Sequence, residues 1–307
     1  MRIALLASSN MMPGPGEKRS DVHEYVEELG SLTPAFAAHG LELEPRLWDD
    51  AARFAGEYDA LLPLIVWDYF EGRERQFLDT MDAAAKQTTV LNPPELLRWN
   101  ADKSYLEELA DKGAPVIPTI RVDRVSEADA ERAFAEFGTD RIVIKPQVGG
   151  GAWRQVLLSK GDPWPEADTL PPAGTLIQPF LSSVVEEGEY TFLYFGGAFS
   201  HGLVKTAAKG DYRIQSMYGG TERPYQPSTD ELARAEAVLG SLDETPLYAR
   251  VDLLRGLDGQ LALIELEMIE PYLYLPMAKV GEDGLNTGAV RLAKALSARL
   301  GAQAATR

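Results

Sequence analysis

Three carboxylates in the C-terminal third of the chain have types and spacing that could hold a divalent cation. In the segment VDLLRGLDGQLALIELE, Asp252 precedes and Glu265 and Glu267 follow the dipeptide Asp258-Gly259. That dipeptide is a strong signal for a two-residue hairpin turn. Counting outward from it places Asp252 opposite Glu265 and Arg250 opposite Glu267. Because side chains alternate along a strand, all four share one face.

This shared face has more negative charge than a protein leaves uncompensated. Carboxylates this close repel one another unless positive charge lies between them. Arg250 compensates one, and Mg²⁺, which prefers carboxylate oxygens and substrate phosphates, would compensate the rest. The alternative interpretation is a solvated face with an Arg–Glu cross-strand pair. The opposite face is predicted to be the core side and carries Val251, Leu253, Ile264 and Leu266.

A glycine-rich segment, RIVIKPQVGGGAWRQVLL (141–158), could cover phosphates. Lys145 precedes the glycines, and WRQVLL continues as a strand. A P-loop has its lysine after the glycines and runs into a helix, and the protein-kinase loop has its lysine on a later strand. The pattern therefore predicts a hairpin whose glycine tip lets backbone amides approach phosphate oxygens. A plain flexible turn is the alternative. Lys103 is a second candidate phosphate ligand, or else a solvated lysine at a helix start.

The elements that must position these residues fall into two groups. The first part of the chain alternates strands with helices, which predicts a small parallel-sheet α/β domain. Its strands are expected at 2–8, 41–48, 58–68 and 88–93. Its helices are expected at 21–40 and 73–87, and Asp21 is the expected N-cap of the first. The remainder of the sequence predicts helices at 100–113, 126–138, 229–242 and 287–301, and Ser126 is the expected N-cap of the second. It also predicts a strand at 175–181, hairpins at 190–207 and 247–271, and a long polar loop at 209–228.

Composition narrows the class of protein. With 307 residues, 45% hydrophobic and 25% charged, the chain reads as a globular protein of about two domains. The lack of cysteine excludes disulfides, thiolate zinc sites and cysteine nucleophiles. A net charge of −17 argues against nucleic acid as a partner. No apolar run approaches the ~18 residues of a membrane helix, so we expect a cytoplasmic protein with no membrane partner.

These pieces occur in the order typical of the ATP-grasp superfamily. The likeness rests on a lysine before a small domain, the VIKP strand with its glycine loop, a QPF segment, a VD strand and a final E-x-[NE] strand. Over about residues 95–300 the chain resembles the ligases that modify ribosomal protein S6 and the glutathione-synthetase-type ligases. The resemblance implies an α/β (α+β) ATP-grasp fold, divided into an N-terminal pre-ATP-grasp domain at 1–98, a central lid subdomain at 99–180 and a C-terminal subdomain with the metal site at 181–307.

The resemblance also implies roles for individual residues. ATP phosphates would be bound by Lys103 and Lys145 and covered by Gly149, Gly150 and Gly151. Adenine would lie beside Gln178, Pro179 and Phe180, and the ribose beside Glu186 or Glu187. Asp252, Glu265 and Glu267 would hold one or two Mg²⁺ ions, for which Mn²⁺ could substitute. The stretch KGDYRIQSMYGG, similar to the family's G-D-[FY]-R loop, would place Arg213 near the γ-phosphate and the substrate carboxylate, with Lys205 and Lys209 nearby.

Two departures bear on the substrate. The ribosomal-protein ligases have asparagine where this chain has Glu267, followed by a small Pro-Gly turn instead of EMIEPYLYLP. The acid-x-arginine pattern that follows the adenine-binding hinge in the family appears here as Glu189-Tyr190-Thr191, so threonine stands in place of the arginine. One branch of the superfamily, similar to D-cycloserine synthetase, closes a small amino-acid derivative on itself. A chain of this length is compatible with such a substrate.

The predicted activity is ATP- and Mg²⁺-dependent ligation of a carboxylate to an amine through an acylphosphate, on a small amino-acid-like substrate. A kinase-like phosphotransferase and a non-catalytic nucleotide-binding protein are the alternatives. A homo-oligomer is compatible with the sequence. Substrate contacts are expected from the loop after the first strand, from the segment after the strand at 58–68 and from two C-terminal tyrosines, namely Ser9, Asn10, Asp68, Tyr69, Tyr272 and Tyr274.

Overall fold

The computed structural model describes residues 1–208, 210–214 and 219–305. Its N-terminal sheet is parallel, with strand order β2-β1-β3-β4, as the alternation of strands and helices predicts. The strands are β1 (Arg2–Ala7), β2 (Glu42–Leu47), β3 (Ala60–Ile65) and β4 (Thr89–Val90). All six residues of β3 are buried, which explains why its sequence is continuously apolar and does not alternate.

The helices of this part cover that sheet. They are α1 (Val22–Ala38), α2 (Ala51–Phe54) and α3 (Glu74–Ala85), with short 3-10 turns η1 (Trp48–Asp50) and η2 (Ala55–Glu57). Asp21 stands at the N-cap position of α1, as expected, but its side chain makes no capping hydrogen bond. The carboxylate of Asp21 pairs instead with Arg19 at 2.8 Å.

A second, smaller sheet is antiparallel, with strand order β5-β8-β6-β7. Its strands are β5 (Ile120–Val122), β6 (Arg141–Pro146), β7 (Val156–Ser159) and β8 (Thr175–Pro179), and α6 (Glu127–Phe137) packs on it. Ser126 starts α6 with a full capping box, and Gly138 ends it at φ +63. Both signals are visible in the sequence.

The third sheet is antiparallel and has five strands in the order β11-β10-β9-β12-β13. They are β9 (Glu189–Phe195), β10 (Ala198–Thr206), β11 (Thr221–Tyr225), β12 (Tyr248–Arg255) and β13 (Leu261–Glu267). One face packs on α5 (Tyr105–Asp111) and α8 (Thr229–Gly240), with Phe192, Val251 and Leu263 fully buried. The opposite face carries the charged residues.

Two expected elements differ from the structure. The helix expected at 100–113 begins only at Tyr105, and α4 (Pro94–Asn100) precedes it, so a turn separates two short helices. The segment expected to be a loop at 209–228 contains β11, which pairs with β10. Its sequence, TERPY, lacks the apolar alternation that marks a strand. The remaining elements are α7 (Ser183–Glu186), η4 (Leu275–Met277) and α9 (Thr287–Ala305).

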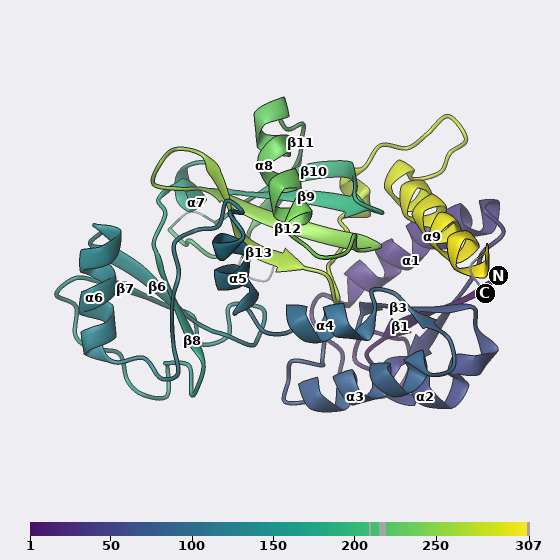
Figure 1. Ribbon diagram of the computed structural model, residues 1–307, viewed down its shortest axis with the longest axis horizontal. Coiled ribbons are helices and arrows are strands. Elements are labelled where there is room, and N and C mark those ends of the chain that lie inside the picture. The colour runs from purple at the N-terminus through teal and green to yellow at the C-terminus, as the bar shows by residue number, and fades with distance from the viewer. Residues whose placement is uncertain (209, 215–218, 306–307) are drawn as a thin grey trace.

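The three sheets are arranged so that the five-stranded sheet lies between the other two (Figure 1). The last helix, α9, returns to the N-terminal part and packs against α1, sharing one apolar core with β1 and β3 through Leu292, Ala293 and Leu296. In contrast, α5 shares its core with the five-stranded sheet. The division at 98 and 180 stays a prediction.

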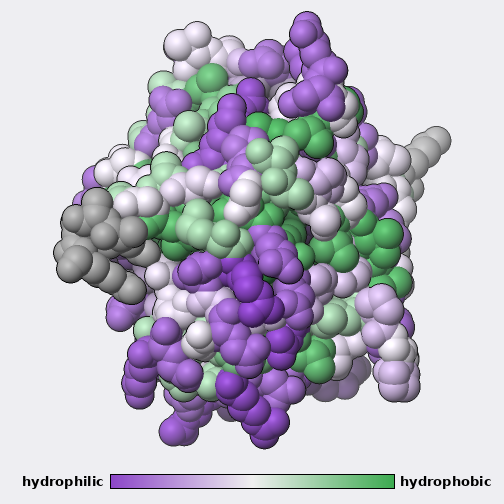
Figure 2. Space-filling view, turned by 90° about the vertical axis from the view of Figure 1, so that its right-hand side faces the viewer, coloured by the Kyte–Doolittle hydropathy of each residue, from purple (hydrophilic) through white to green (hydrophobic). Residues whose placement is uncertain are grey.

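The surface carries both hydrophobic and hydrophilic residues (Figure 2). On the face that carries the α1 and α9 end, hydrophobic residues gather in a band between hydrophilic ones (Figure 2). Within the described ranges, no helix is long and apolar enough to span a membrane. Assembly into a homo-oligomer stays a prediction.

Candidate active site

The hairpin of β12 and β13 presents the acidic face, but its turn and its strand register differ from those expected. Arg250 pairs with Glu267 and Asp252 with Glu265, as predicted, but Arg255 pairs with Leu261. Five residues separate this pair, and the backbone NH of Gly256 donates to the carbonyl of Gln260 at 2.8 Å. The turn therefore consists of the three residues 257–259, with Gly259 at φ +75, and is not the expected two-residue turn.

A β-bulge restores the expected pairing. The register shifts between Asp252 and Leu253, so that Leu253 lies opposite Leu263 and Ile264 is the extra residue. The prediction that Ile264 faces the core is wrong, because the bulge turns it into the cavity. Leu253 and Leu266 do face the core, as expected.

A cavity of about 300 Å³ lies over this acidic face. All three sheets contribute to its walls. Trp67 and Phe70 come from the N-terminal part, Lys145 and Phe180 from the small sheet, and the acidic hairpin from the five-stranded sheet. A site at the junction of domains is typical of small-molecule and cofactor binding.

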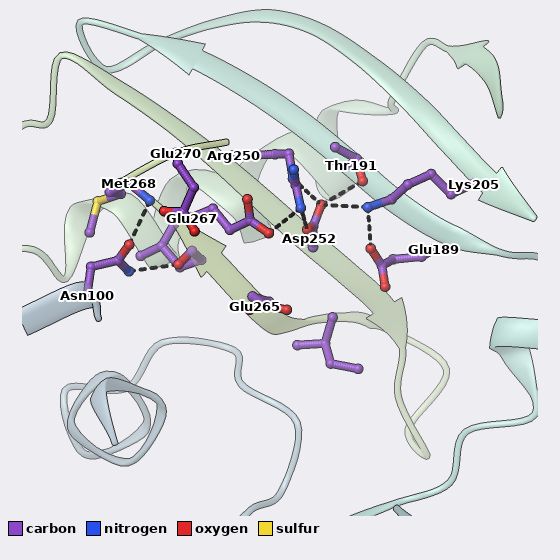
Figure 3. A network of polar contacts seen from close by, with 12 residues as sticks. Asn100, Glu189, Thr191, Lys205, Arg250, Asp252, Glu265, Glu267, Met268 and Glu270 are labelled. Atoms are coloured by element: carbon purple, nitrogen blue, oxygen red, sulfur yellow. Dashed lines mark hydrogen bonds and ion pairs between the residues drawn. The ribbon is translucent and has the colours of Figure 1, made fainter. Parts of the chain in front are cut away.

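Asp252 is the centre of a buried ion-pair network (Figure 3). It accepts hydrogen bonds from Arg250 at 2.8 Å, Thr191 Oγ1 at 2.6 Å and Lys205 Nζ at 3.4 Å. Lys205 also pairs with Glu189 at 2.6 Å. Burial disfavours the charge on Asp252, but the adjacent cations Arg250 and Lys205 hold its pKa below the ordinary value. Asp252 is therefore held in its ionised form.

Glu267 and Glu265 flank this centre, and their pKa values are shifted in opposite directions. Arg250 also hydrogen-bonds Glu267, yet burial and the neighbouring carboxylates raise the pKa of Glu267 to about 8. Glu265 pairs with Lys103 at 3.1 Å, and although burial opposes its charge, Lys103 and Lys145 keep its pKa below the ordinary value. Negative charge thus exceeds the available compensation around Glu267.

These donors fit Mg²⁺ chemically. They are carboxylate oxygens on one face, and a divalent cation would offset the burial and the repulsion from neighbouring carboxylates that raise the pKa of Glu267. Among the described residues, no three His, Cys, Asp or Glu side chains already converge as a metal cage. Arg250 instead contacts oxygens of Asp252 and Glu267, and Lys103 contacts an oxygen of Glu265. The metal role of the three acids stays a prediction.

The two candidate phosphate lysines lie together under the glycine hairpin. Lys145 is 8% exposed and its Nζ has only a long contact, 3.4 Å, to the carbonyl of Ile264. Burial lowers the pKa of Lys145 to about 8, and the positive charge of Lys103 adds to that effect. Lys103 donates to the carbonyl of Gly149, and so ties the hairpin tip to the start of α5. A buried cation without a close anion is suited to an anionic ligand.

The glycine hairpin itself is as predicted, with Ile144 opposite Val156 and a loop between them. Gly149 has φ +139 and Gly151 φ +62, which favour glycine. Gly150 lies against the ring of Phe70, where an added Cβ would come within 3.4 Å. The tip therefore touches the N-terminal part and closes over the cavity.

The candidate adenine region is apolar. Phe180 lines it together with Val143, Leu181, Leu254 and Ile264. Gln178 and Pro179 also line the cavity, and the amide of Gln178 donates to Thr119 Oγ1 at 2.9 Å. These are walls that would suit a flat aromatic base.

Glu186 and Glu187, the candidate ribose ligands, are not among the described residues that line this cavity. Both lie at a separate surface groove, where Glu187 pairs with Arg255 at 2.8 Å. Glu189, two residues further on, does line the cavity. The alternation of β9 could have shown this, because Glu189 and Thr191 share a face with Asp252.

The catalytic candidates are only partly described. Lys205 and Arg213 line the cavity, and Arg213 pairs with Asp211 at 2.7 Å. Burial alone would weaken the charge on Lys205, but Asp252 and Glu189 raise its pKa above the ordinary value, so it stays protonated. Lys209 lies outside the described residues. The roles of all three stay predictions.

The six substrate candidates separate into two groups. Tyr272 and Tyr274 line the cavity, whereas the other four are absent from its described lining, namely Ser9, Asn10, Asp68 and Tyr69. Asp68 is buried and accepts from Ser8 at 2.6 Å, Trp48 at 2.7 Å and Arg73 at 2.6 Å. Those bonds hold the ends of β1 and β3 together, which is a structural role.

Sequence reasoning missed an acidic group at the substrate end of the cavity. Glu24, from α1, and Glu222, from β11, both line it. Neither carboxylate has a hydrogen bond or ion pair with another described residue, whereas Asp252, Glu265 and Glu267 all have cationic partners. Burial, with repulsion from Asp21 and Glu222, raises the pKa of Glu24 to about 8. No local motif marks these residues, because the fold alone brings them together.

The fold is that of the ATP-grasp ligases. Over 97% of its length the chain is similar to D-alanine–D-alanine ligase from Bacillus anthracis, with a TM-score of 0.66 and 17% identity, covering 98% of that chain. It is similar to the ATP-grasp ligase PsnB in complex with precursor peptide PsnA2 and AMPPNP, with a TM-score of 0.60 and 18% identity, and 97% of each chain is covered. At these identities the likeness shows the shared fold.

Residues 3–92 match the family described as D-cycloserine synthetase DcsG, N-terminal domain. The chain is 30% identical over 299 residues to the cycloserine biosynthesis protein DcsG of Streptomyces lavendulae, covering 89% of this chain and 94% of that protein. The crystal structure of D-cycloserine synthetase DcsG matches 98% of this chain and 100% of its own, with a TM-score of 0.81 and 26% identity. The chain therefore belongs to the D-cycloserine synthetase family.

Membership confirms the predicted fold class, superfamily and reaction class. The protein is an ATP-dependent, ADP-forming carboxylate–amine ligase that acts on a small molecule. Solved structures of this fold include a complex with ATP and one with Mg and ADP, which agrees with the prediction of ATP and Mg²⁺ as cofactors.

Proposed function

We propose that this ligase closes a ring within one small amino-acid derivative that carries both the reacting carboxylate and the reacting amine. The observation that carries the proposal is the division of charge in the cavity. Lys145, which is buried, and Lys103, which is partly buried, line the cavity beside the glycine hairpin. Glu24 and Glu222 line it from α1 and β11, and neither carboxyl group has an ion-pair partner among the described residues. This polarity is complementary to a phosphate chain followed by a small ligand with a cationic amine.

The relation to DcsG suggests the substrate. Cycloserine is a cyclic hydroxamate, and opening its ring amide with water gives O-amino-serine. That linear acid has a carboxylate, an α-ammonium group and a terminal aminooxy nitrogen. In our proposal Glu24 and Glu222 hold its α-ammonium group, and the enzyme acts in antibiotic biosynthesis.

The reaction balances without an added oxidant or reductant. A carboxylate oxygen of the substrate bonds to the γ-phosphorus while the bond to the β,γ-bridging oxygen breaks, which releases ADP. The aminooxy nitrogen then bonds to the acyl carbon, the carbon–oxygen bond to phosphate breaks, and the nitrogen gives its proton to solvent. The products are the cyclic amide, ADP and inorganic phosphate.

The residues contribute mainly positioning and charge. Lys145 and Lys103 hold the phosphates, the glycine hairpin excludes water, and Arg213 and Lys205 stabilise negative charge that develops on the acyl oxygen. Asp252, Glu265 and Glu267 would hold one or two Mg²⁺ ions, for which Mn²⁺ could substitute, and the metal would neutralise charge on the transferred phosphoryl group.

The decisive experiment incubates the protein with ATP, Mg²⁺ and O-amino-D-serine or O-amino-L-serine, and measures ADP, phosphate and the cyclic product by mass spectrometry. Cyclic product in equal amount to ADP is expected. A stable phosphorylated acid would instead show a phosphotransferase, and nucleotide binding without ADP formation would show a non-catalytic binder. ADP formation that yields only linear amides with added amines would refute ring closure.

A further inference from the structure

Three aromatic side chains form a continuous wall on one side of the cavity, and we call Trp67, Tyr272 and Tyr274 the aromatic wall. Trp67 and Tyr272 meet edge to face with ring centres 6.1 Å apart, and Tyr272 meets Tyr274 at 4.5 Å. All three line the cavity, and each is less than 10% exposed. The wall is therefore well packed and has little freedom to move.

The wall stands directly beside the ion-pair network around Asp252. The ring centre of Tyr274 lies 5.6 Å from Lys205 Nζ and 5.7 Å from Arg250 Cζ. Those two cations bind Asp252 from either side (Figure 3). Cation–π contacts at this range fix the ring over the network. The ring of Tyr274 consequently fills the volume next to Lys205 and Arg250.

The backbone holds Tyr274 in an unusual conformation to achieve this. Its φ is +48 and its ψ +39, in the left-handed region where bulky residues are rare. Such conformations persist only where the surroundings impose them, and they concentrate at functional sites. A glycine would satisfy the backbone without strain, so the presence of a tyrosine calls for a role of its side chain.

The adjoining segment is clamped from two sides. The Tyr272 hydroxyl donates to Glu27 at 2.6 Å, and the backbone NH of Leu273 donates to the buried carboxylate of Glu28. His201 Nε2 lies 2.9 Å from the carbonyl oxygen of Leu273. Burial lowers the pKa of His201 to about 4, so the imidazole is neutral and its Nε2–H donates. These bonds keep the wall from retracting to admit a larger ligand.

We propose that the aromatic wall, and Tyr274 above all, occupies the place where a separate amine would approach the acylphosphate. An amine that belongs to the substrate itself needs no such place, because it is already within reach of the acyl carbon. The wall thus restricts the enzyme to ring closure. This inference rests on the proposed function and identifies the residues that decide between ring closure and joining of two molecules.

The test measures how the acylphosphate partitions. Wild-type protein and Tyr274→Gly are given ATP, Mg²⁺, O-amino-D-serine and excess D-alanine, and cyclic and linear amides are quantified by mass spectrometry. Wild type should give the cyclic product alone. In Tyr274→Gly the ratio of linear to cyclic product should rise by about tenfold or more, which is the discrimination that pocket size typically supplies.

Two further variants keep the test decisive. Tyr274→Phe retains the ring and should keep the wild-type ratio of linear to cyclic product, and Tyr272→Ala, which removes the neighbouring ring, should also raise the linear product. Thermal unfolding shows whether each variant is folded. Exclusive ring closure by Tyr274→Gly would overturn the inference, and so would loss of ADP formation in it while Tyr274→Phe stays active. If wild type consumes ATP without any cyclic product, the proposed function fails instead.

Discussion

Replacing Lys145 with methionine is expected to stabilise the nucleotide-free protein and to remove most of its affinity for ATP. Lys145 is 8% exposed and has no anionic partner within ion-pair distance among the described residues, and burial lowers its pKa from 10.5 to about 8. One pH unit corresponds to ~1.4 kcal/mol, so the buried charge costs on the order of 3 kcal/mol at neutral pH. Methionine keeps the length of the side chain and removes the charge.

The pH dependence follows from the direction of this shift. Between about 8 and 10.5 the unfolded protein binds more protons at this position than the folded protein, so the stability of wild type rises with pH in that window. Below pH 8 the full cost is present. The difference in unfolding free energy between Lys145→Met and wild type should therefore be largest near pH 7 and shrink as the pH rises through the window.

Urea denaturation at pH 7 and pH 10 measures the difference, and calorimetric titration with a non-hydrolysable ATP analogue and Mg²⁺ measures binding. Lys160→Met is the matched control, because Lys160 is exposed and should change neither quantity. Loss of a charge-assisted phosphate contact should weaken binding by about 1.5–3 kcal/mol. A variant that is less stable than wild type at pH 7 and binds the analogue equally well would refute the placement of Lys145 as a buried phosphate ligand.

Three further predictions concern other parts of the cavity. Glu265→Gln should abolish phosphate release from ATP while circular dichroism shows an intact fold, because it removes the anion paired with Lys103 and a predicted metal ligand; near-normal release would exclude that role. Amide exchange across 147–154 should slow on addition of a non-hydrolysable ATP analogue with Mg²⁺ if the glycine hairpin is a lid, and unchanged protection would leave it a simple turn. Burial and the charges of Asp21 and Glu222 raise the pKa of Glu24 from 4.5 to about 8, so its contribution to stability is complete below about 4.5 and is lost as the pH rises toward 8. Glu24→Gln should therefore flatten the fall in melting temperature between pH 5 and pH 8 and raise KM for the amine substrate, and a wild-type pH profile in the variant would contradict this.

The hairpin of β12 and β13 shows how far sequence reasoning reaches. The pairing of Asp252 with Glu265 follows from counting, yet the count assumed a two-residue turn and no bulge, and both assumptions are wrong. The two differences cancel at the acids and leave only Ile264 misplaced. A bulge has no residue signature comparable to that of a turn, so local patterns could not reveal it.

Residues that act together from distant elements are the least predictable part of the site. Lys145 and the glycines can be proposed as phosphate ligands from the sequence because a motif surrounds them. Glu24 lies on α1 close to two other glutamates, Glu27 and Glu28, and Glu222 lies on a strand whose sequence is typical of a loop, so neither residue has a local signal. Their proximity depends on how α1 meets β11, which is a property of tertiary packing. Asp68 shows a different limit of sequence reasoning. It does have a local signal, its position after a strand, but that position suits a substrate ligand and a buried structural acid equally well.

The return of α9 to the N-terminal sheet has a consequence for biosynthesis of the protein. The core beneath α1 is built from β1 and β3 together with Leu292, Ala293 and Leu296, which are synthesised some 230 residues after β3. On the ribosome, where domains generally fold as units from the N-terminus, this part cannot complete its core until nearly the whole chain has emerged. The ATP-grasp portion, whose own apolar cores are formed by residues between these two ends, can fold first and then bring α9 back to α1. Formation of the active-site cavity, which needs walls from both parts, would then be among the last events of folding.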